Sequence, residues 1–375
     1  MGNKLQHYTI ELYAEGPIFI GSGKMLGKKE YIFVPRAQKV HVPNLEKMCV
    51  FFLNNGLMES YETYLLEDQR DFAVWLRNNG VTERAYLPWI AYTLDSGDAV
   101  IEQKGKKEIA TFKEIATFLK DAYGCPYIPG SSLKGALRTI LLGMELIQHP
   151  ERYADTKRSV QMTKLGGSKK HLLTREVQSL ETSVFRTLQR DKDHRSNAIN
   201  DCLSGLRVGD SEPLSIEDLT LCQKVDVTTD GRERPLPILR ECLKPGTVIR
   251  FPLTLSPESS LTPEAIQHAA TTFAQYYDDC FFNAFPLNEI NGGGNLYLGG
   301  GSGYATKTVT YPLLGKETAQ VQRVSEIIDA TLSFKARSQH KHREDRRKGV
   351  SPHMLKCTRY QGELYEMGAC TMEIK

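Results

Sequence analysis

The sequence predicts an α+β fold built from two ferredoxin-like (RRM-like) units that carry helical and basic insertions. Two segments, HYTIELYAEG at 7–16 and TVIRFPLTLS at 247–256, alternate apolar and polar residues as antiparallel strands do. Helical patterns follow each of them, and this strand-first order argues against a doubly wound parallel sheet. We expect residues 1–150 to form the first unit, 151–204 a basic, flexible insertion, and 205–375 the second unit.

In the first half the expected order is strand, turn, strand and then helices. GPIFIGSGK at 16–24 is typical of a turn, and KEYIFV at 29–34 favours a second strand. Residues 44–120 are expected to form a mainly helical insertion, because VFFLNNGLMESYETYLL (50–66) and ATFKEIATFLKDA (110–122) space their apolar residues as helices do.

The second half repeats the strand-first order. LRVGDSEPL at 206–214 predicts a strand that runs into a turn, and the β-branched KVDVTT at 224–229 predicts another. The segment 262–285 opens with Thr-Pro-Glu, a typical helix start. NLYLGGGSGYATKTVTY at 295–311, with its glycine-rich loop inside 292–303, predicts strand, loop and strand, and VQRVSEIIDATLSFKA at 321–336 predicts a helix.

Composition excludes several classes of protein. The 375 residues contain no apolar run of the ~18 residues that a membrane span needs, and the N-terminus lacks the apolar core of a signal peptide. We therefore expect a cytoplasmic protein that makes no membrane contact. The eight cysteines are scattered without a C-x-x-C pair, so neither a zinc site nor another metal site or cofactor is expected.

The net charge of +3 is small, but the basic residues gather in two zones. Residues 151–200 hold 11 Lys and Arg against 6 Asp and Glu, and KARSQHKHREDRRK at 335–348 holds 7 against 2. Such zones on a nearly neutral chain favour local contact with a polyanion. The second zone has two open interpretations, an arm that binds RNA or a solvated loop.

The stretch YIPGSSLKGALRTILLG at 127–143 reads as a helix with an unusual first turn. Lys134 is unfavourable beside the partial positive charge of a helix N-terminus, and Gly135 costs up to about 1 kcal/mol relative to Ala. Ser131 or Ser132 could cap the free amides. Together with Arg138 these groups predict a seat for a phosphate. The alternative is an ordinary capped helix whose Lys reaches solvent and whose Gly packs on a neighbour.

The segment 292–311 places seven glycines before Lys307. Glycines allow close approach of a ligand to the backbone, so an RNA strand could lie along this loop, with Lys307 supplying charge and Tyr304 stacking. The alternative is a flexible hairpin. No Walker motif is present, and the expected strand after the loop argues against a dinucleotide site.

IPGSSLKGALR at 128–138 resembles the signature helix of the RAMP superfamily, the RNA-binding subunits of CRISPR effector complexes. IFIGSGK (18–24), LRVGDSEPL (206–214) and LGGGSGYATKTV (298–309) resemble the other marks of the superfamily, in the same order. Within it, the chain most resembles the subunit that caps the crRNA 3′ end of type III-A complexes. The DGRERPLPILRECLKPGT run at 230–247 supports that likeness.

This resemblance implies ferredoxin-like folds, a role in crRNA maturation and antiviral interference, and a set of partners. The partners are crRNA, the backbone RAMP subunit and a small helical subunit, and a host exonuclease could be recruited for 3′ trimming. The implied RNA-binding residues are Gly21, Ser22, Gly23, Lys24, Ser131, Ser132, Lys134, Arg138, Gly299, Gly300, Gly301, Ser302, Gly303 and Lys307.

We expect no catalytic residues. The backbone subunit of these complexes cuts RNA with an Asp shortly after its IGSG-like turn, but this chain has KMLGKKEYIF there, with Glu30 as its only acid. The guide-processing relatives often use a His, and His41, which follows the second predicted strand, is the nearest candidate. A metal-independent endoribonuclease that processes CRISPR repeat RNA is therefore the alternative function. Asp210, Glu212, Asp278 and Asp279 are not expected to bind a metal.

Overall fold

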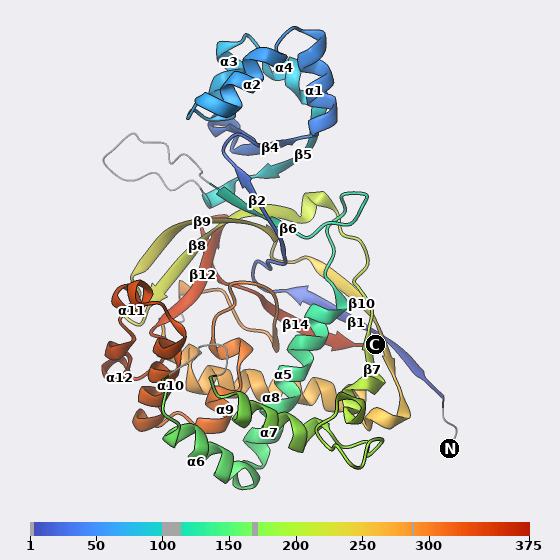
Figure 1. Cartoon of the computed structure of the whole chain (residues 1–375), viewed down its shortest axis with the longest axis vertical. Helices are drawn as coiled ribbons and strands as arrows, with labels where there is room; N and C mark the ends of the chain where they lie inside the picture. Colours follow the sequence, from blue (N-terminus) through green and yellow to red (C-terminus); the bar gives the residue numbers. More distant parts are fainter. Residues whose placement is uncertain (1–3, 100–113, 167–171, 287–288) are drawn as a thin grey trace.

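The computed structural model describes residues 4–99, 114–166, 172–286 and 289–375. It is a mixed α+β structure with two curled sheets, a layer of long helices at one end and a small helical lobe at the other (Figure 1). Within the described ranges, no helix is both long and apolar enough to cross a membrane.

The first sheet joins strands from the two ends of the chain in the order β11-β14-β1-β10-β7. The strands are β1 (Gln6–Ala14), β7 (Leu206–Val208), β10 (Val248–Leu255), β11 (Leu296–Tyr297) and β14 (Ala369–Ile374). Strand β1 is antiparallel to β10 on one side and to β14 on the other. The alternation that predicted β1 and β10 is confirmed, because every second residue points into the core.

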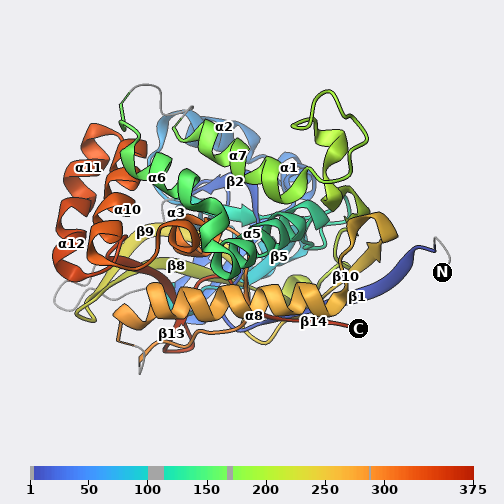
Figure 2. The same ribbon diagram turned by 90° about the horizontal axis from the view of Figure 1, so that it is seen from below.

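Two long helices, α5 (Gly130–Gln148) and α8 (Pro263–Cys280), pack on each other beside this sheet (Figure 2). Both were predicted. The apolar stripe of α5, which includes Leu133, Leu137 and Ile140, is buried. Along the chain, β1, α5, β7, β10, α8 and β14 follow the order β-α-β-β-α-β.

The second sheet has the order β2-β6-β9-β8-β5-β4-β3, and β12 pairs with β8 on one side and β13 on the other. Its members are β2 (Gly21–Gly27), β3 (Ile32–Val34), β4 (Lys39–Pro43), β5 (Ile90–Asp95), β6 (Glu114–Phe118), β8 (Leu219–Thr228), β9 (Glu233–Leu243), β12 (Met354–Tyr360) and β13 (Glu363–Glu366). Most pairs are antiparallel, but β5–β8 and β6–β9 are parallel. This sheet reaches from the main body into the helical lobe (Figure 1).

The lobe consists of α1 (Leu45–Asn54), α2 (Met58–Glu67), α3 (Phe72–Asn78) and α4 (Glu83–Tyr86), packed around an aromatic core. Phe52 is fully buried at its centre, with the Trp75 ring centroid 5.2 Å away. The helical prediction for 50–66 is thus confirmed. The remaining helices are α6 (Ala154–Met162), α7 (Thr174–Phe185), α9 (Thr310–Leu314), α10 (Thr318–Thr331), α11 (Phe334–His340) and α12 (Asp345–Lys348).

Three local predictions are wrong. In 110–122, residues 114–118 form strand β6 rather than a helix. Ile115 and Phe118 are buried between β2 and β9, and this tertiary pairing outweighs a weak helical pattern. Residues 110–113 lie outside the described residues. The GSGK turn is the start of strand β2, with a register shift between Gly21 and Met25. The strand expected after the glycine loop is instead a 3-10 turn, Ala305–Lys307, followed by α9.

Candidate nucleic-acid interface

The start of α5 is docked on the segment that follows β7, so two of the sequence motifs form one structural unit. The Ile128 amide donates to Ser211 Oγ at 2.9 Å, and the Ser211 amide donates back to the Ile128 carbonyl at 2.9 Å. A Cβ on Gly130 would lie 2.3 Å from the Val208 carbonyl oxygen, so only glycine fits there.

The α5 N-terminus already has an anionic partner. The Gly130 amide donates to Asp210 Oδ1 at 2.8 Å, whereas no side chain caps the helix from its own first turn. The prediction that Ser131 or Ser132 caps these amides is therefore wrong. The Asp210 carboxylate, from the segment after β7, complements the helix dipole instead.

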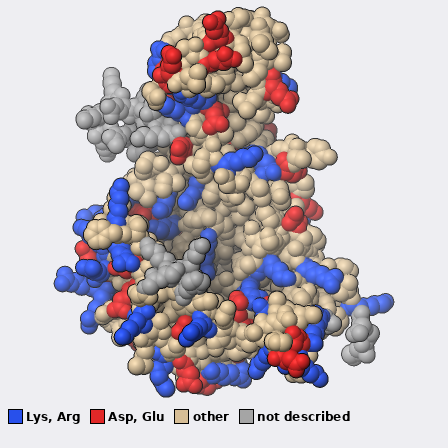
Figure 3. All heavy atoms as spheres, viewed as in Figure 1, with Lys and Arg blue, Asp and Glu red and all other residues tan. Residues whose placement is uncertain are grey.

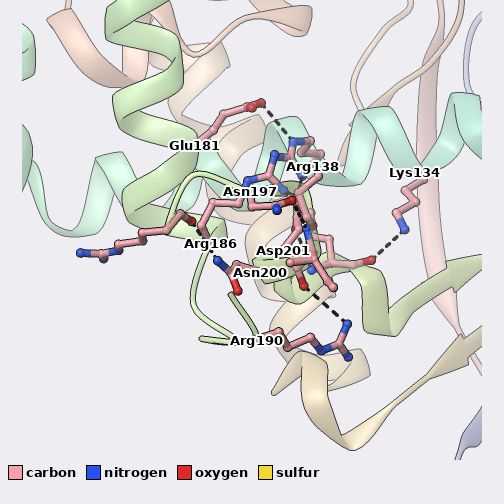
Figure 4. Close-up of polar contacts among 12 residues, drawn as sticks. Lys134, Arg138, Glu181, Arg186, Arg190, Asn197, Asn200 and Asp201 are labelled. Carbon is pink, nitrogen blue, oxygen red and sulfur yellow. Dashed lines mark hydrogen bonds and ion pairs between the residues drawn. The ribbon is translucent and has the colours of Figure 1, made fainter. Parts of the chain in front are cut away.

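The ammonium group of Lys134 is hydrogen-bonded within the protein. Its Nζ donates to the carbonyls of Leu203 and Leu206, at 2.7 Å each, and so fastens the turn before β7 to α5 (Figure 4). Burial lowers the pKa of Lys134, and the nearby charge of Asp201 partly offsets this. The contact explains an unfavourable lysine close to the start of α5 without any bound anion.

Arg138 is also paired within the chain. Its Nε lies 3.2 Å from Glu181 Oε1, its Nη1 lies 2.9 Å from Asp201 Oδ2, and its guanidinium stacks 4.2 Å from the Phe185 ring centroid. Burial opposes its charge, but the hydrogen bonds to Glu181 and Asp201 outweigh it and raise the pKa of Arg138. Figure 4 shows Arg186 converging on the same Asp201 carboxylate. A phosphate role for Lys134 and Arg138 stays a prediction.

Replacing Lys134 by Met distinguishes a structural role of this lysine from a role in binding phosphate. The loss of two hydrogen bonds to the carbonyls of the buried residues Leu203 and Leu206 is expected to lower the free energy of unfolding by about 2 kcal/mol in urea titration. RNA affinity of the folded protein should change less than twofold. Lys192→Met, at an exposed lysine of the 151–204 insertion, is the control and should alter neither quantity. A large affinity loss with little loss of stability would instead support the phosphate seat.

The glycine-rich loop packs closely on the chain that precedes β2. The Gly300 amide donates to the Phe19 carbonyl at 2.6 Å, and a Cβ on Gly299, whose φ is +84°, would lie 2.4 Å from that same oxygen. A Cβ on Gly301 would lie 2.4 Å from Arg240 Nη1. These glycines are required by contacts within the protein, and the loop is held rather than free as the hairpin alternative assumed.

A groove of about 450 Å³ brings the motifs together. Its walls come from the 19–21 segment, the exposed face of α5, and the glycine loop with the turn after it. The lining residues are Phe19, Ile20, Gly21, Ser132, Gly135, Ala136, Thr139, Tyr297, Leu298, Gly299, Gly300, Thr306 and Lys307. A Cβ on Gly135 would meet nothing within 4 Å, so the α5 backbone is open to the groove at that point.

The other predicted binding residues lie outside this lining. Ser22 belongs to the irregular part of β2, where its Oγ lies 2.5 Å from Thr117 Oγ1, and Gly23 and Lys24 are exposed beside it. Ser131 is exposed at the start of α5. Ser302 is buried, donates to the Gly299 carbonyl and accepts from Thr306, which stabilises the loop together with Gly303 at positive φ. Tyr304 is bonded to Thr310 and packs on the core, so it is poorly placed for stacking.

A group of cations adjoins the groove and was missed by the sequence predictions, apart from Lys307. Protein atoms around Lys307 lower its pKa, and the charge of Arg240 lowers it further. Arg240 Nη1 is buried, without a hydrogen-bond partner among the described residues. Lys356 and Lys224 share one carboxylate, Asp226, at 2.9 Å and 3.6 Å, and burial lowers the pKa of Lys224.

These four cations carry more positive charge than Asp226 can balance, which favours an incoming anion. In Figure 3, Lys and Arg side chains border the hollow below the small lobe. The signal in the sequence was the spacing in KVDVTT, which places Lys224 and Asp226 on one face of a strand.

The histidine alternative finds no support in the groove, because none of its described lining residues is a histidine. His41 lies in β4, buried, with Nδ1 2.8 Å from Thr93 Oγ1, and burial lowers its pKa. His342, Asp345 and His353 lie close enough together to hold a metal ion. However, His342 Nδ1 is 3.0 Å from Asp345 Oδ2 and His353 Nδ1 contacts Oδ1, which is the geometry of imidazole–carboxylate hydrogen bonds.

The comparisons with known proteins agree with this architecture. The sequence model of the RAMP superfamily matches residues 11–283, and the chain belongs to this superfamily. The predicted likeness to the fifth subunit of type III-A Csm complexes is confirmed. The chain is 29% identical to the Csm5 protein of Mycobacterium tuberculosis, over all of this chain and 99% of the relative. It is 27% identical to Csm5 of Streptococcus thermophilus, over 82% of each chain.

Solved structures share the fold. A chain from a Csm–crRNA–target RNA ternary complex of a type III-A CRISPR-Cas system superposes with a TM-score of 0.59, covers 98% of this chain and is 21% identical. The crystal structure of T. onnurineus Csm5 superposes with a TM-score of 0.55, covers 97% of this chain and is 19% identical.

Proposed function

We propose that this chain is a non-catalytic subunit of a type III-A CRISPR ribonucleoprotein that binds the 3′ side of crRNA and caps the filament of backbone subunits. In this role it supports crRNA maturation and antiviral interference. The observation that carries the proposal is the groove in which the 19–21 segment, α5 and the glycine loop meet beside Lys307 and Arg240.

The partners follow from the relatives. Full-length likeness to Csm5 proteins, and to a chain found in a Csm–crRNA–target RNA complex, supports crRNA and the Csm subunits as partners. The backbone subunit and the small helical subunit would then contact this chain, and a host exonuclease could trim the 3′ end that it holds.

The groove suits a phosphate backbone better than a base. Gly135 and the glycine loop leave little side-chain bulk between the ligand and the main chain, and Lys307 and its neighbouring cations supply charge. Phosphate contacts fix the position of an RNA without reading its sequence. We therefore expect binding that tolerates changes of sequence and falls with salt.

We also propose two ferredoxin-like units. The first is β1–α5–β7–β10–α8–β14, whose sheet order β14-β1-β10-β7 corresponds to the strand order 4-1-3-2 of that fold. The second is centred on the β8–β9 hairpin with β12 beside it. Residues 1–150, 151–204 and 205–375 stay the proposed sequence division, with the first sheet drawing strands from both outer parts.

The absence of catalysis is part of the proposal. Among the described lining residues of the groove there is no Asp, Glu or His that could act as a general acid or base in RNA cleavage. The alternative, a metal-independent endoribonuclease, predicts a discrete cut of repeat RNA that survives chelator. The proposal predicts intact RNA both with magnesium and with chelator.

Replacing Lys307 by Ala tests the RNA site. The variant is expected to bind crRNA about three- to tenfold more weakly, and the slope of log K against log salt should flatten by about 0.7, the effect of one lost phosphate contact on single-stranded RNA. Lys47→Ala, at an exposed lysine of the helical lobe, is the control and should leave the slope unchanged. Equal slopes for all three proteins would remove Lys307 from the site.

A further inference from the structure

A second groove lies away from the glycine loop, between the end of α6, the helix α10 and the basic segment 335–348. Figure 2 shows α6, α10, α11 and α12 side by side. It has a volume of about 650 Å³. Its lining carries five cations, Lys164, Arg323, Arg337, Arg343 and Arg346, against two carboxylates, Glu326 and Asp329. We call it the arginine groove.

Two of these arginines build the walls of the groove. Arg323 donates to the carbonyls of Val160 and Thr163 and pairs with Glu326 at 2.9 Å, which joins α10 to the end of α6. Arg337 donates to the Asp329 carbonyl at 2.5 Å and so closes the end of α10. The charge of Glu326 is thereby balanced by Arg323.

The other two arginines are available to a ligand. Arg343 and Arg346 are exposed, and neither has an ion pair or side-chain hydrogen bond among the described residues. Phe334 is 89% exposed at the start of α11, one helical turn before Arg337 of the groove lining, and Met162, in the lining, is 77% exposed. An exposed aromatic ring next to a groove with unpaired arginines is a combination that binds single-stranded nucleic acid, by stacking a base and neutralising phosphates.

The basic segment 335–348 is held in place by a buried carboxylate. Asp345 is fully buried and is bonded to His342, His353 and Ser351. Because the segment is fixed before any ligand arrives, ligand binding costs less ordering entropy than it would for a flexible segment. This favours an RNA-binding role for 335–348 over the interpretation as a solvated loop.

The arginine groove is also connected with the first site by charge. Burial lowers the pKa of His340, the charges of His342, Lys356 and Lys224 lower it further, and the charge of Asp226 opposes them. The segment 335–348 thus lies within electrostatic reach of the Lys224–Lys356 pair beside the glycine loop.

We propose that the arginine groove, with Phe334, is a second binding site for single-stranded RNA, which holds the continuation of a strand bound at the glycine loop. This inference rests on the proposed function, since the same RNA occupies both sites. The exposed ring favours RNA over an acidic protein segment, which would use the arginines but leave Phe334 without a partner.

The test compares two RNAs, one of about 10 nucleotides, enough for one site, and one of about 30, enough for both. Binding is measured by fluorescence anisotropy with the full chain. Wild type should bind the longer RNA about tenfold more tightly. Arg343→Ala/Arg346→Ala and Phe334→Ala should each remove most of that advantage and leave the short RNA unaffected.

Lys47→Ala/Arg84→Ala removes the same charge from exposed sites on the helical lobe and should behave as wild type. Circular dichroism checks that each variant is folded. If the groove variants keep the advantage of the longer RNA, or lose only binding to a purified Csm subunit, the inference is wrong and the proposed function stands. If wild type binds neither RNA, both the inference and the proposed function are wrong.

Discussion

Replacing Asp345 by Ala is expected to lower the free energy of unfolding by about 3–5 kcal/mol. The carboxylate has no exposed surface and accepts hydrogen bonds from His342 and Ser351, at 3.0 Å and 2.7 Å, and from His353. Its removal leaves buried polar groups without a partner, which is the costly way to break such a network. Urea denaturation measures the change.

The neighbouring Glu344→Ala is the matched control, since Glu344 is exposed, and its effect should stay within about 0.5 kcal/mol. Burial opposes ionisation of Asp345, but the hydrogen bonds outweigh it and hold the pKa of Asp345 below its ordinary value. Its stabilisation is therefore present above about pH 4 and is lost as pH falls through the lowered pKa. Equal effects of the two substitutions would contradict the network's importance.

Replacing Glu366 by Gln is expected to stabilise the protein at neutral pH. Burial raises the pKa of Glu366 from 4.5 to about 8, although Tyr277 and Tyr297 both donate hydrogen bonds to its carboxyl group. The unfolded chain ionises near pH 4.5 and the folded chain near pH 8, so the wild type loses stability as pH rises between these values. At pH 7 the difference is about 3 kcal/mol, from about 1.4 kcal/mol per pH unit.

The measurement is the free energy of unfolding of both proteins at several pH values between 5 and 8. The advantage of the Gln variant over wild type should increase by about 1.4 kcal/mol per pH unit. Glu363→Gln, at an exposed position of the same strand, is the control and should show no such trend. A difference between wild type and Glu366→Gln that is constant with pH would show that this carboxyl group ionises normally.

Long, strongly periodic elements were predictable from the sequence. The stripe of α5 and the alternation of β1 and β10 are each determined by their own residues. The structure of segment 110–122 was not predictable, because Ile115 and Phe118 fit a buried strand as well as a helix. The pairing of β6 with β9 selects the strand. The strands after residue 353 were not predicted, and neither was the union of β1 with β14, because both depend on distant partners.

The candidate site divides in the same way. The sequence motifs indicated the segments that line the groove, and Lys307 among its cations. They could not show that Lys134 and Arg138 have partners in the 181–206 region, because those contacts join residues more than 40 positions apart. Arg240 lies in the 230–247 run, which gave no sign of a binding role, and Lys356 in a strand that was not predicted, so only the folded structure brings them to the glycine loop.

The central position of β1 in the first sheet also has a consequence for synthesis. Ile10 pairs with Ile374, so β1 is synthesised long before β14, the strand that covers its second edge. Until then the nascent chain exposes an apolar strand edge, the kind of surface that chaperones protect and that slows folding. Partner subunits that bind before β14 has been made would therefore meet an incomplete sheet.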